Sequence, residues 1–184
     1  MNKWLKYTLA ACMAALCSTS LAQAESSIYT GAGLGLFEMD PGQNKKSAIG
    51  GNLFLGAEFG PLLAVEGRLG SSQSVTSLGE TSKVDWLASL LAKPKYDIAG
   101  NINIYALAGV TIMKASFTPR LGKQQSKTTT GLSYGLGAEI YLNYNTLLGL
   151  EWVRYATKAD AGVKNSNFKG LDVNAFLASL QVKF

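Results

Sequence analysis

The chain has 184 residues, of which 47% are hydrophobic and 16% are charged, and its formal charge is +5. This length allows one domain, or a small domain with a targeting segment. Charged residues are scarcer than the roughly 25% typical of soluble domains, yet no run of about 20 apolar residues could form a spanning helix. The chain has no histidine, which excludes Ser-His-Asp and Cys-His catalysis and histidine metal sites, because each needs an imidazole.

Residues 1–24 contain the features of a secretory signal peptide in their usual order. Lys3 and Lys6 precede a mostly apolar core, and small residues then lead to an A-x-A cleavage site that ends at Ala24. The core is too short to span a bilayer permanently. We therefore expect export, cleavage after Ala24, and a mature domain of residues 25–184.

Two other interpretations of this segment stay open. One is a buried N-terminal helix, which would make the positive flank and the A-x-A site coincidental. The other is a lipoprotein, because residues 9–12 resemble a lipoprotein cleavage box, although the apolar core before Cys12 is shorter than usual. Cys12 and Cys17 are the only cysteines, so cleavage after Ala24 leaves a mature chain without thiols or disulfides.

From Ser27 onward the sequence alternates with the period of a β-strand. The alternation recurs in eight segments of about ten residues, which is typical of barrel strands. These segments are residues 27–38, 48–59, 62–70, 83–93, 102–113, 131–142, 147–155 and 171–184. One face of each segment is apolar, and the other carries charges and glycines. In the fourth segment, for example, we expect Val84 and Trp86 on the apolar face and Asp85 and Lys93 opposite them.

Alternation alone does not separate a soluble barrel, whose apolar faces line a cavity, from a membrane barrel, whose apolar faces meet lipid. The glycines decide in favour of the membrane barrel. Gly31, Gly33, Gly135 and Gly137 share the charged face, which is unusual for a solvated surface. In a narrow lumen the same glycines leave room for neighbouring side chains.

The connections between segments alternate in length, as outer loops and periplasmic turns do in membrane barrels. The long ones are residues 39–47, 71–82, 118–130 and 156–170, and the short ones are 60–61, 94–101 and 143–146. Only the connection at Pro94 is long for its side. The sequence therefore predicts an all-β, eight-stranded, antiparallel up-and-down transmembrane β-barrel with both termini in the periplasm. Candidate aromatic girdle residues on the lipid face are Phe59, Trp86, Tyr134, Trp152, Phe176 and Phe184.

The mature chain resembles the small eight-stranded outer-membrane barrels, a family that includes the transmembrane domain of OmpA, OmpX and the opacity-type surface proteins. The resemblance rests on the signal peptide, the glycine-alternating residues 29–35, the strand 105–110 and the C-terminal ending. In that ending, Leu180, Val182 and Phe184 look like the family's assembly signal. Because the sequence ends at Phe184, we expect no peptidoglycan-binding domain like that of full-length OmpA-like proteins.

The resemblance implies a place in the outer membrane of a Gram-negative bacterium. Expected partners are outer-membrane lipids, lipopolysaccharide, the outer-membrane assembly machinery and periplasmic chaperones, and we expect a monomer. Without Lys3 and Lys6, the chain has 15 basic and 12 acidic residues, a charge of +3 that is too mild to suggest nucleic acid.

Charges on the inward face are predicted to form a salt-bridge network that fills the lumen, because an eight-stranded interior barely holds its own side chains. Its members are Glu58, Glu66, Arg68, Lys93, Glu139, Glu151 and Lys183. The alternative is a small gated pore. Arg154 breaks the pattern, since strict alternation points it at lipid. It either snorkels near the interface or is turned inward by a bulge near Trp152 and Val153. We expect the bulge, which would balance four acids with four bases.

Some outer-membrane barrels that resemble this chain are lipid A deacylases, acyltransferases or proteases, but those families carry a histidine. We therefore expect no catalytic site, metal or cofactor. The long connections sum to +5 and the rest of the mature chain to −2. Cationic loops of this kind suit lipopolysaccharide phosphates or an acidic host polymer, and the alternative is solvated loops with no ligand. The candidate contacts are Arg120, Lys123, Lys127, Lys158, Lys164 and Lys169.

Overall fold

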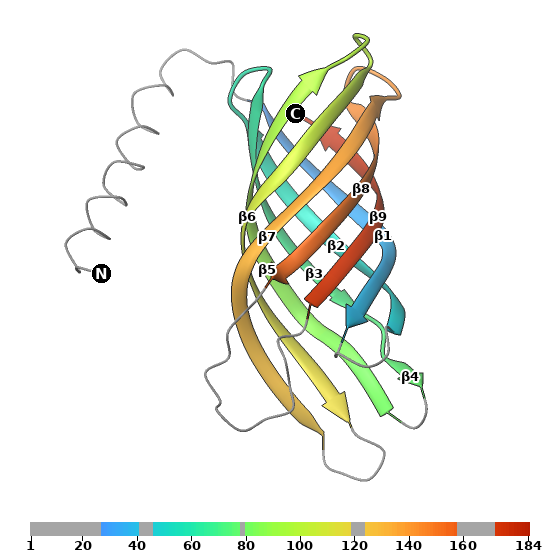
Figure 1. Cartoon of the computed structure of the whole chain (residues 1–184). Helices are drawn as coiled ribbons and strands as arrows, with labels where there is room; N and C mark the ends of the chain where they lie inside the picture. The colour runs from blue at the N-terminus through green and yellow to red at the C-terminus, as the bar shows by residue number, and fades with distance from the viewer. Residues whose placement is uncertain (1–26, 41–45, 78–79, 119–123, 158–171) are drawn as a thin grey trace, which may run out of the picture.

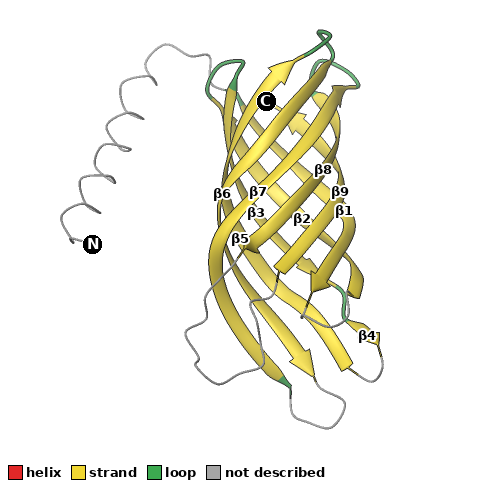
Figure 2. Ribbon diagram, in the orientation of Figure 1, coloured by secondary structure: helices red, strands yellow, loops and turns green. Residues whose placement is uncertain are grey.

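The structure is a computed structural model that describes residues 27–40, 46–77, 80–118, 124–157 and 172–184. All regular secondary structure in these ranges is β-strand (Figure 2). No helix within the described ranges is both long enough and apolar enough to cross a membrane. The predicted signal peptide, with Cys12 and Cys17, lies outside the described residues.

Eight long strands and one short strand form a single antiparallel sheet (Figure 1). They are β1 (Ile28–Asp40), β2 (Lys46–Glu58), β3 (Leu63–Ser72), β4 (Val75–Ser77), β5 (Glu80–Asp97), β6 (Ile102–Thr118), β7 (Gln125–Tyr141), β8 (Thr146–Thr157) and β9 (Asp172–Lys183). Each long strand pairs with the next long strand along the chain, including β3 with β5, and the β1–β9 pair closes the barrel. The short strand β4 pairs with the first residues of β5. The predicted eight-stranded antiparallel barrel is confirmed.

The strands are strongly tilted, because each is staggered relative to the next. One row of cross-strand partners circles the barrel through Ile28, Ala57, Val65, Ala92, Ala108, Tyr134, Arg154, Asn174 and Glu38. The row returns to β1 ten residues beyond its start, from Ile28 to Glu38. This shear of ten for eight strands gives the tilt visible in Figure 1 and leaves a narrow interior.

The barrel is apolar outside and buries charged side chains inside. Leu34 and Leu53 on the outer surface are 70% and 67% exposed, whereas Glu66 and Arg68 inside are 0% and 3% exposed. The predicted girdle residues Trp86, Tyr134, Phe176 and Phe184 are also exposed on the outer surface. Such a surface fits hydrocarbon rather than water, in agreement with the orientation predicted from the glycines.

The strands are longer than the sequence pattern indicates. β5 continues through Pro94 to Asp97, so the connection predicted to span residues 94–101 is only a turn of residues 98–101. The Lys95 N–H donates to the Leu62 carbonyl on the β3 side, so the N–H that Pro94 lacks would have pointed to β6. The pairing of β5 with β6 is interrupted there, between Ala92–Ala108 and Lys95–Tyr105, and resumes in the same register. At the opposite end, β5, β6 and β7 project beyond the other strands (Figure 1).

A bulge in β5 changes the predicted faces of two residues. The register between β5 and β6 shifts between Val84 and Trp86. Val84 is consequently fully buried inside, while Trp86 is 42% exposed outside. The expectation that the two residues share the lipid face was wrong, because an inserted residue reverses the alternation on one side of a bulge.

Two inward tyrosines lie over glycines of a neighbouring strand. Tyr29 pairs with Gly56, and Tyr105 pairs with Gly137. A Cβ atom at either glycine would overlap the partner ring. Both rings are at most 5% exposed, so neither has free space to move into. These glycines thus allow the tyrosine rings to lie across the neighbouring strands.

The Gly137→Ala substitution should lower the free energy of unfolding by about 1–3 kcal/mol, because the new methyl group must displace the buried Tyr105 ring. Gly67→Ala is the matched control, since a Cβ there meets only the Leu55 carbonyl oxygen at 3.9 Å. Denaturant unfolding in lipid vesicles, followed by tryptophan fluorescence, measures both. Equal stability of the two variants would contradict the packing described here.

Candidate functional site: the lumen

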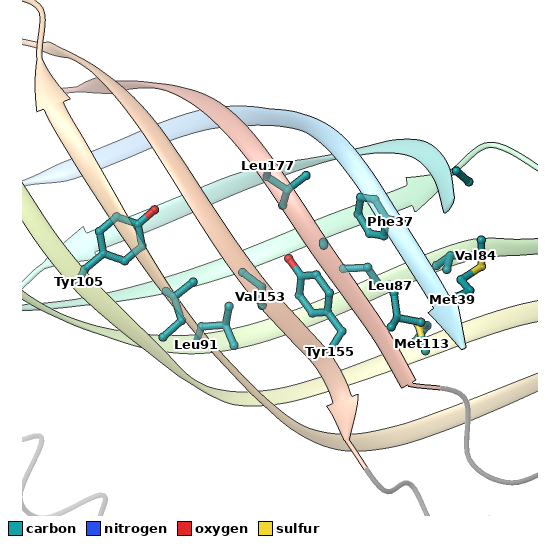
Figure 3. Packing of buried hydrophobic residues seen from close by; sticks show 14 residues of the cluster. Phe37, Met39, Val84, Leu87, Leu91, Tyr105, Met113, Val153, Tyr155 and Leu177 are labelled. Atoms are coloured by element: carbon teal, nitrogen blue, oxygen red, sulfur yellow. The ribbon is translucent and has the colours of Figure 1, made fainter. Parts of the chain in front are cut away.

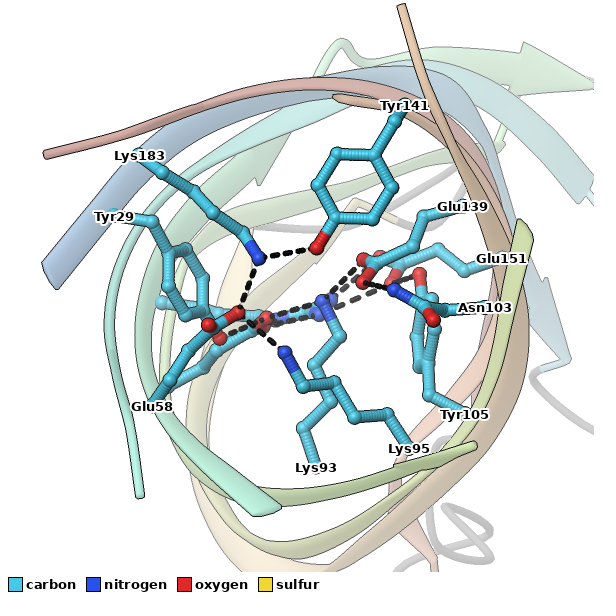
Figure 4. Close-up of polar contacts among 12 residues, drawn as sticks. Tyr29, Glu58, Lys93, Lys95, Asn103, Tyr105, Glu139, Tyr141, Glu151 and Lys183 are labelled. Atoms are coloured by element: carbon cyan, nitrogen blue, oxygen red, sulfur yellow. Dashed lines mark hydrogen bonds and ion pairs between the residues drawn. The ribbon is translucent and has the colours of Figure 1, made fainter. Parts of the chain in front are cut away.

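Five charged side chains meet in the middle of the lumen, and we call them the central group: Glu66, Arg68, Lys93, Glu139 and Glu151 (Figure 4). Arg68 bridges two carboxylates, with nitrogen–oxygen distances of 2.5 Å to both Glu66 and Glu151. Lys93 Nζ lies 3.1 Å from Glu66 and 2.8 Å from Glu139. Because strands β3, β5, β7 and β8 each contribute a member, the group ties opposite walls of the barrel together.

The two lumen tyrosines complete the central group. Tyr29 Oη donates a hydrogen bond to Glu66 at 2.8 Å, and Tyr105 Oη donates one to Glu151 at 3.0 Å. The Lys93 ammonium also lies 4.2 Å from the centre of the Tyr105 ring, within cation–π range. Buried carboxylates are tolerated only when paired and hydrogen-bonded, and both conditions are met here.

A second set of charges occupies the end of the lumen where the short turns lie, and we call it the mouth group: Glu58, Lys95 and Lys183. Lys95 Nζ lies 2.5 Å and Lys183 Nζ 2.8 Å from Glu58 Oε1. Lys183 also donates a hydrogen bond to Tyr141 Oη at 2.6 Å. The mouth group carries a formal charge of +1 and the central group −1, so the two together are neutral.

Lys95 is the member that the sequence analysis missed. It is 8% exposed and faces the lumen, as the alternation from Lys93 requires. The prediction ended the strand at Lys93 because Pro94 was taken as the start of a turn. The balance of four acids and four bases is therefore reached with Lys95 and not with Arg154.

The expected bulge that would turn Arg154 inward was wrong. The ladder between β8 and β9 is regular from Trp152 to Tyr155. Val153 and Tyr155 are fully buried inside, so Arg154 lies with Trp152 on the outer face. The register between β7 and β8 does shift, but on the far side of Arg154. Tyr134 pairs with Arg154 and Leu132 with Thr157, so a step of two residues on β7 corresponds to a step of three on β8. Arg154 thus lies three residues before the end of β8, near the outer loops.

The half of the lumen nearer the long connections is packed with apolar side chains (Figure 3). Its fully buried members include Phe37, Met39, Val84, Leu87, Met113, Tyr155 and Val173. The Phe37 and Tyr155 rings stack with centroids 6.2 Å apart. The lumen therefore has two layers of filling, one ionic and one apolar.

The geometry of the lumen favours a structural role over catalysis. Each of the four lumen carboxylates is bound to a lysine or arginine. Within the described ranges, no group of three or more acidic or thiol side chains could hold a metal ion. A general base or nucleophile needs an accessible, unpaired group, and these carboxylates are buried and paired.

Most of the predicted loop contacts lie outside the described residues: Arg120, Lys123, Lys158, Lys164 and Lys169. Lys127 is described and lies half-buried in the projecting part of β7. At the C-terminus, Leu180 and Phe184 are 50% and 77% exposed on the outer face, and Val182 is partly exposed. Their role as an assembly signal stays a prediction.

Comparisons with known proteins agree with this architecture. Residues 8–184 match the family described as outer membrane protein beta-barrel domain. Ail, the attachment invasion locus protein of Yersinia pestis, is 22% identical, with 88% of this chain and 99% of that chain covered and a TM-score of 0.58. Neisserial surface protein A is 16% identical, with 86% and 99% covered and a TM-score of 0.71.

A third similar structure is the N-terminal β-barrel domain of Pseudomonas aeruginosa OprF, which is 15% identical, with 88% and 100% covered and a TM-score of 0.62. None of the curated proteins matches the chain. The closed barrel with its apolar outer surface defines a small transmembrane β-barrel. The chain belongs to the outer membrane protein beta-barrel family and is an outer-membrane protein of the Gram-negative type.

Removing a cation from the central group should be costly. We expect Arg68→Met to lower the free energy of unfolding by about 3–5 kcal/mol, because it leaves Glu66 and Glu151 buried with too few partners. The control is Lys83→Met, which removes an exposed lysine 3.8 Å from Asp85 and should cost no more than about 1 kcal/mol. Denaturant unfolding in vesicles measures both, and similar losses in the two variants would refute a stabilising network.

Proposed function

We propose that this protein is a closed, non-enzymatic barrel that holds cationic loops at the cell surface, where they bind phosphate- or sulfate-bearing polymers. The observation that carries the proposal is the location of positive charge. The four long connections sum to +5, whereas the rest of the mature chain sums to −2. The whole positive excess therefore lies at one end of the molecule.

The filled lumen supports a scaffold rather than a channel. Ion pairs join opposite walls in one half, and apolar side chains fill the other half. An ion crossing the barrel would have to separate the buried pairs and enter an apolar layer, and both steps oppose conduction. A rigid barrel of this kind keeps the ends of the outer loops at fixed positions, which favours binding by several loops at once.

The loop residues in this proposal are Arg120, Lys123, Lys127, Lys158, Lys164 and Lys169. Arginine and lysine bind phosphate and sulfate through charge-assisted hydrogen bonds, and a cluster of them also attracts a polyanion over a distance. Ail, which shares this fold, has been crystallised with the heparin analogue sucrose octasulfate. The ligand class proposed here is either the lipopolysaccharide phosphates or an acidic host polymer.

Retention on immobilised heparin at increasing salt tests the loop proposal. The full chain should bind at low salt and elute as salt rises, because exposed charges are screened. Replacing the six loop cations with glutamine should reduce affinity at least about tenfold. The double control Lys83→Gln and Lys114→Gln changes lysines on the strands and should bind like the parent protein. Unchanged binding by the six-residue variant would contradict the proposal.

A further inference from the structure

The outer surface of the barrel has an apolar hollow that the loop proposal does not use. It measures about 510 Å³ and lies across β7, β8, β9 and β1. Leu34, Leu136 and Leu150 form its walls, and the small residues Gly35 and Ala178 form its floor. Ala178 pairs with Leu150 on one side and with Leu34 on the other. The hollow forms because this small side chain stands between two large ones.

Arg154 lies directly beyond the end of this hollow that is nearer the long connections. Trp152 and Phe176 line that end and are cross-strand partners. The next outward-facing pair on the same two strands is Arg154 and Asn174. On the other side, Arg154 pairs with Tyr134, whose ring contacts Trp152 edge-on at 5.9 Å between centroids. A cation flanked by aromatic rings therefore stands where the apolar surface ends.

Two other hollows on the outer surface differ from this one in the charged side chains beside them. One lies between Tyr96 and Ile104 near the short turns, at the opposite end of the barrel from the long connections. The other extends from Ala32 and Leu53 to Trp86, whose cross-strand partner is Lys114, and its lining includes Asp85. A lysine is a point charge, whereas a guanidinium binds a phosphate with two parallel hydrogen bonds. Of the three hollows, only the first combines an apolar floor with an arginine at its outer end.

We propose that this surface binds lipid A, the phosphorylated anchor of lipopolysaccharide, with an acyl chain in the hollow and a phosphate on Arg154. The outer leaflet surrounds the end of the barrel that carries the long connections, and lipid A supplies both chemical groups there. Arg154 lies close to the end of β8, where an outward arginine costs only about 0–1 kcal/mol, so it can reach the headgroup layer. Asn174 lies beside it, and Glu38 on β1 bounds the site on the far side.

This site differs from the outer loops in its position on the molecule. The loops contain the cations that would bind soluble polymers, whereas Arg154 and Ala178 lie on the strands that contact lipid. Lipid A binding is therefore measured separately from heparin binding, and the failure of one proposal leaves the other standing.

Native mass spectrometry of the full barrel in detergent micelles, with added bisphosphorylated lipid A, tests the site. We expect one lipid A to be retained, and Arg154→Gln to weaken its binding about tenfold, because a charge-assisted hydrogen bond is lost. Ala178→Leu keeps every charge but fills the floor of the hollow, and it should weaken binding severalfold. Heat-modifiable gel migration shows that each variant is folded.

Two matched controls make the same kinds of change elsewhere on the outer surface. Lys114→Gln removes one positive charge on β6, and Ala108→Leu enlarges an exposed alanine on β6. Both should retain lipid A like the parent protein. The proposal is overturned if Arg154→Gln and Ala178→Leu bind lipid A normally, or if the controls lose it equally. It is also overturned if phosphatidylglycerol displaces lipid A at equal concentration, since the surface would then bind any anionic lipid.

Discussion

The ion-pair network around Arg68 is the interaction on which the rest of the structure depends. A shear of ten on eight strands leaves room only for side chains, and four carboxylates point into that space. Each would be strongly destabilising alone, because a buried charge without a partner keeps its full desolvation cost. Arg68 and Lys93 each bind two of the carboxylates. Residues far apart in the chain are thereby held together across the lumen.

The network also explains features that look unrelated in the sequence. Gly56 and Gly137 allow Tyr29 and Tyr105 to lie across neighbouring strands, and both tyrosine hydroxyls then bind network carboxylates. The apolar layer of Phe37, Leu87 and neighbouring residues fills the remaining half. The interior thus has no surplus charge to offer a ligand, and the positive excess of the protein stays in the outer loops. Function is consequently expected at the loops and on the lipid-facing wall.

The sequence was sufficient for the faces of most strands but not for their contacts. Glu66 and Arg68 are two residues apart, so alternation alone places both inside. Glu151, the partner of Arg68, and Glu139, the partner of Lys93, come from distant strands, and the pairing depends on the stagger around the whole barrel, which no local pattern contains. Lys95 was missed because Pro94 usually ends a strand, whereas β5 continues past Pro94 after a short break in its pairing with β6.

The bulges show the same limit. The pattern predicted a bulge at Trp152 and Val153, but the irregularities lie at Val84 in β5 and beyond Arg154 in β8. A bulge depends on how neighbouring strands must bend, and that is a property of the assembled sheet. The apolar layer was hidden for another reason. Where Leu87 or Leu91 faces inward between outward apolar residues, both faces of the segment are apolar, and alternation no longer marks the inside.

The central claim is that the two layers of filling close the lumen and make the barrel a scaffold. Single-channel recording of the purified protein in planar lipid bilayers tests this claim most directly. The filled lumen predicts a baseline without stable conductance steps, because an ion would have to break the central group and cross the apolar layer. Large and stable conductance steps from the folded, heat-modifiable protein would contradict the account and would favour a gated pore instead.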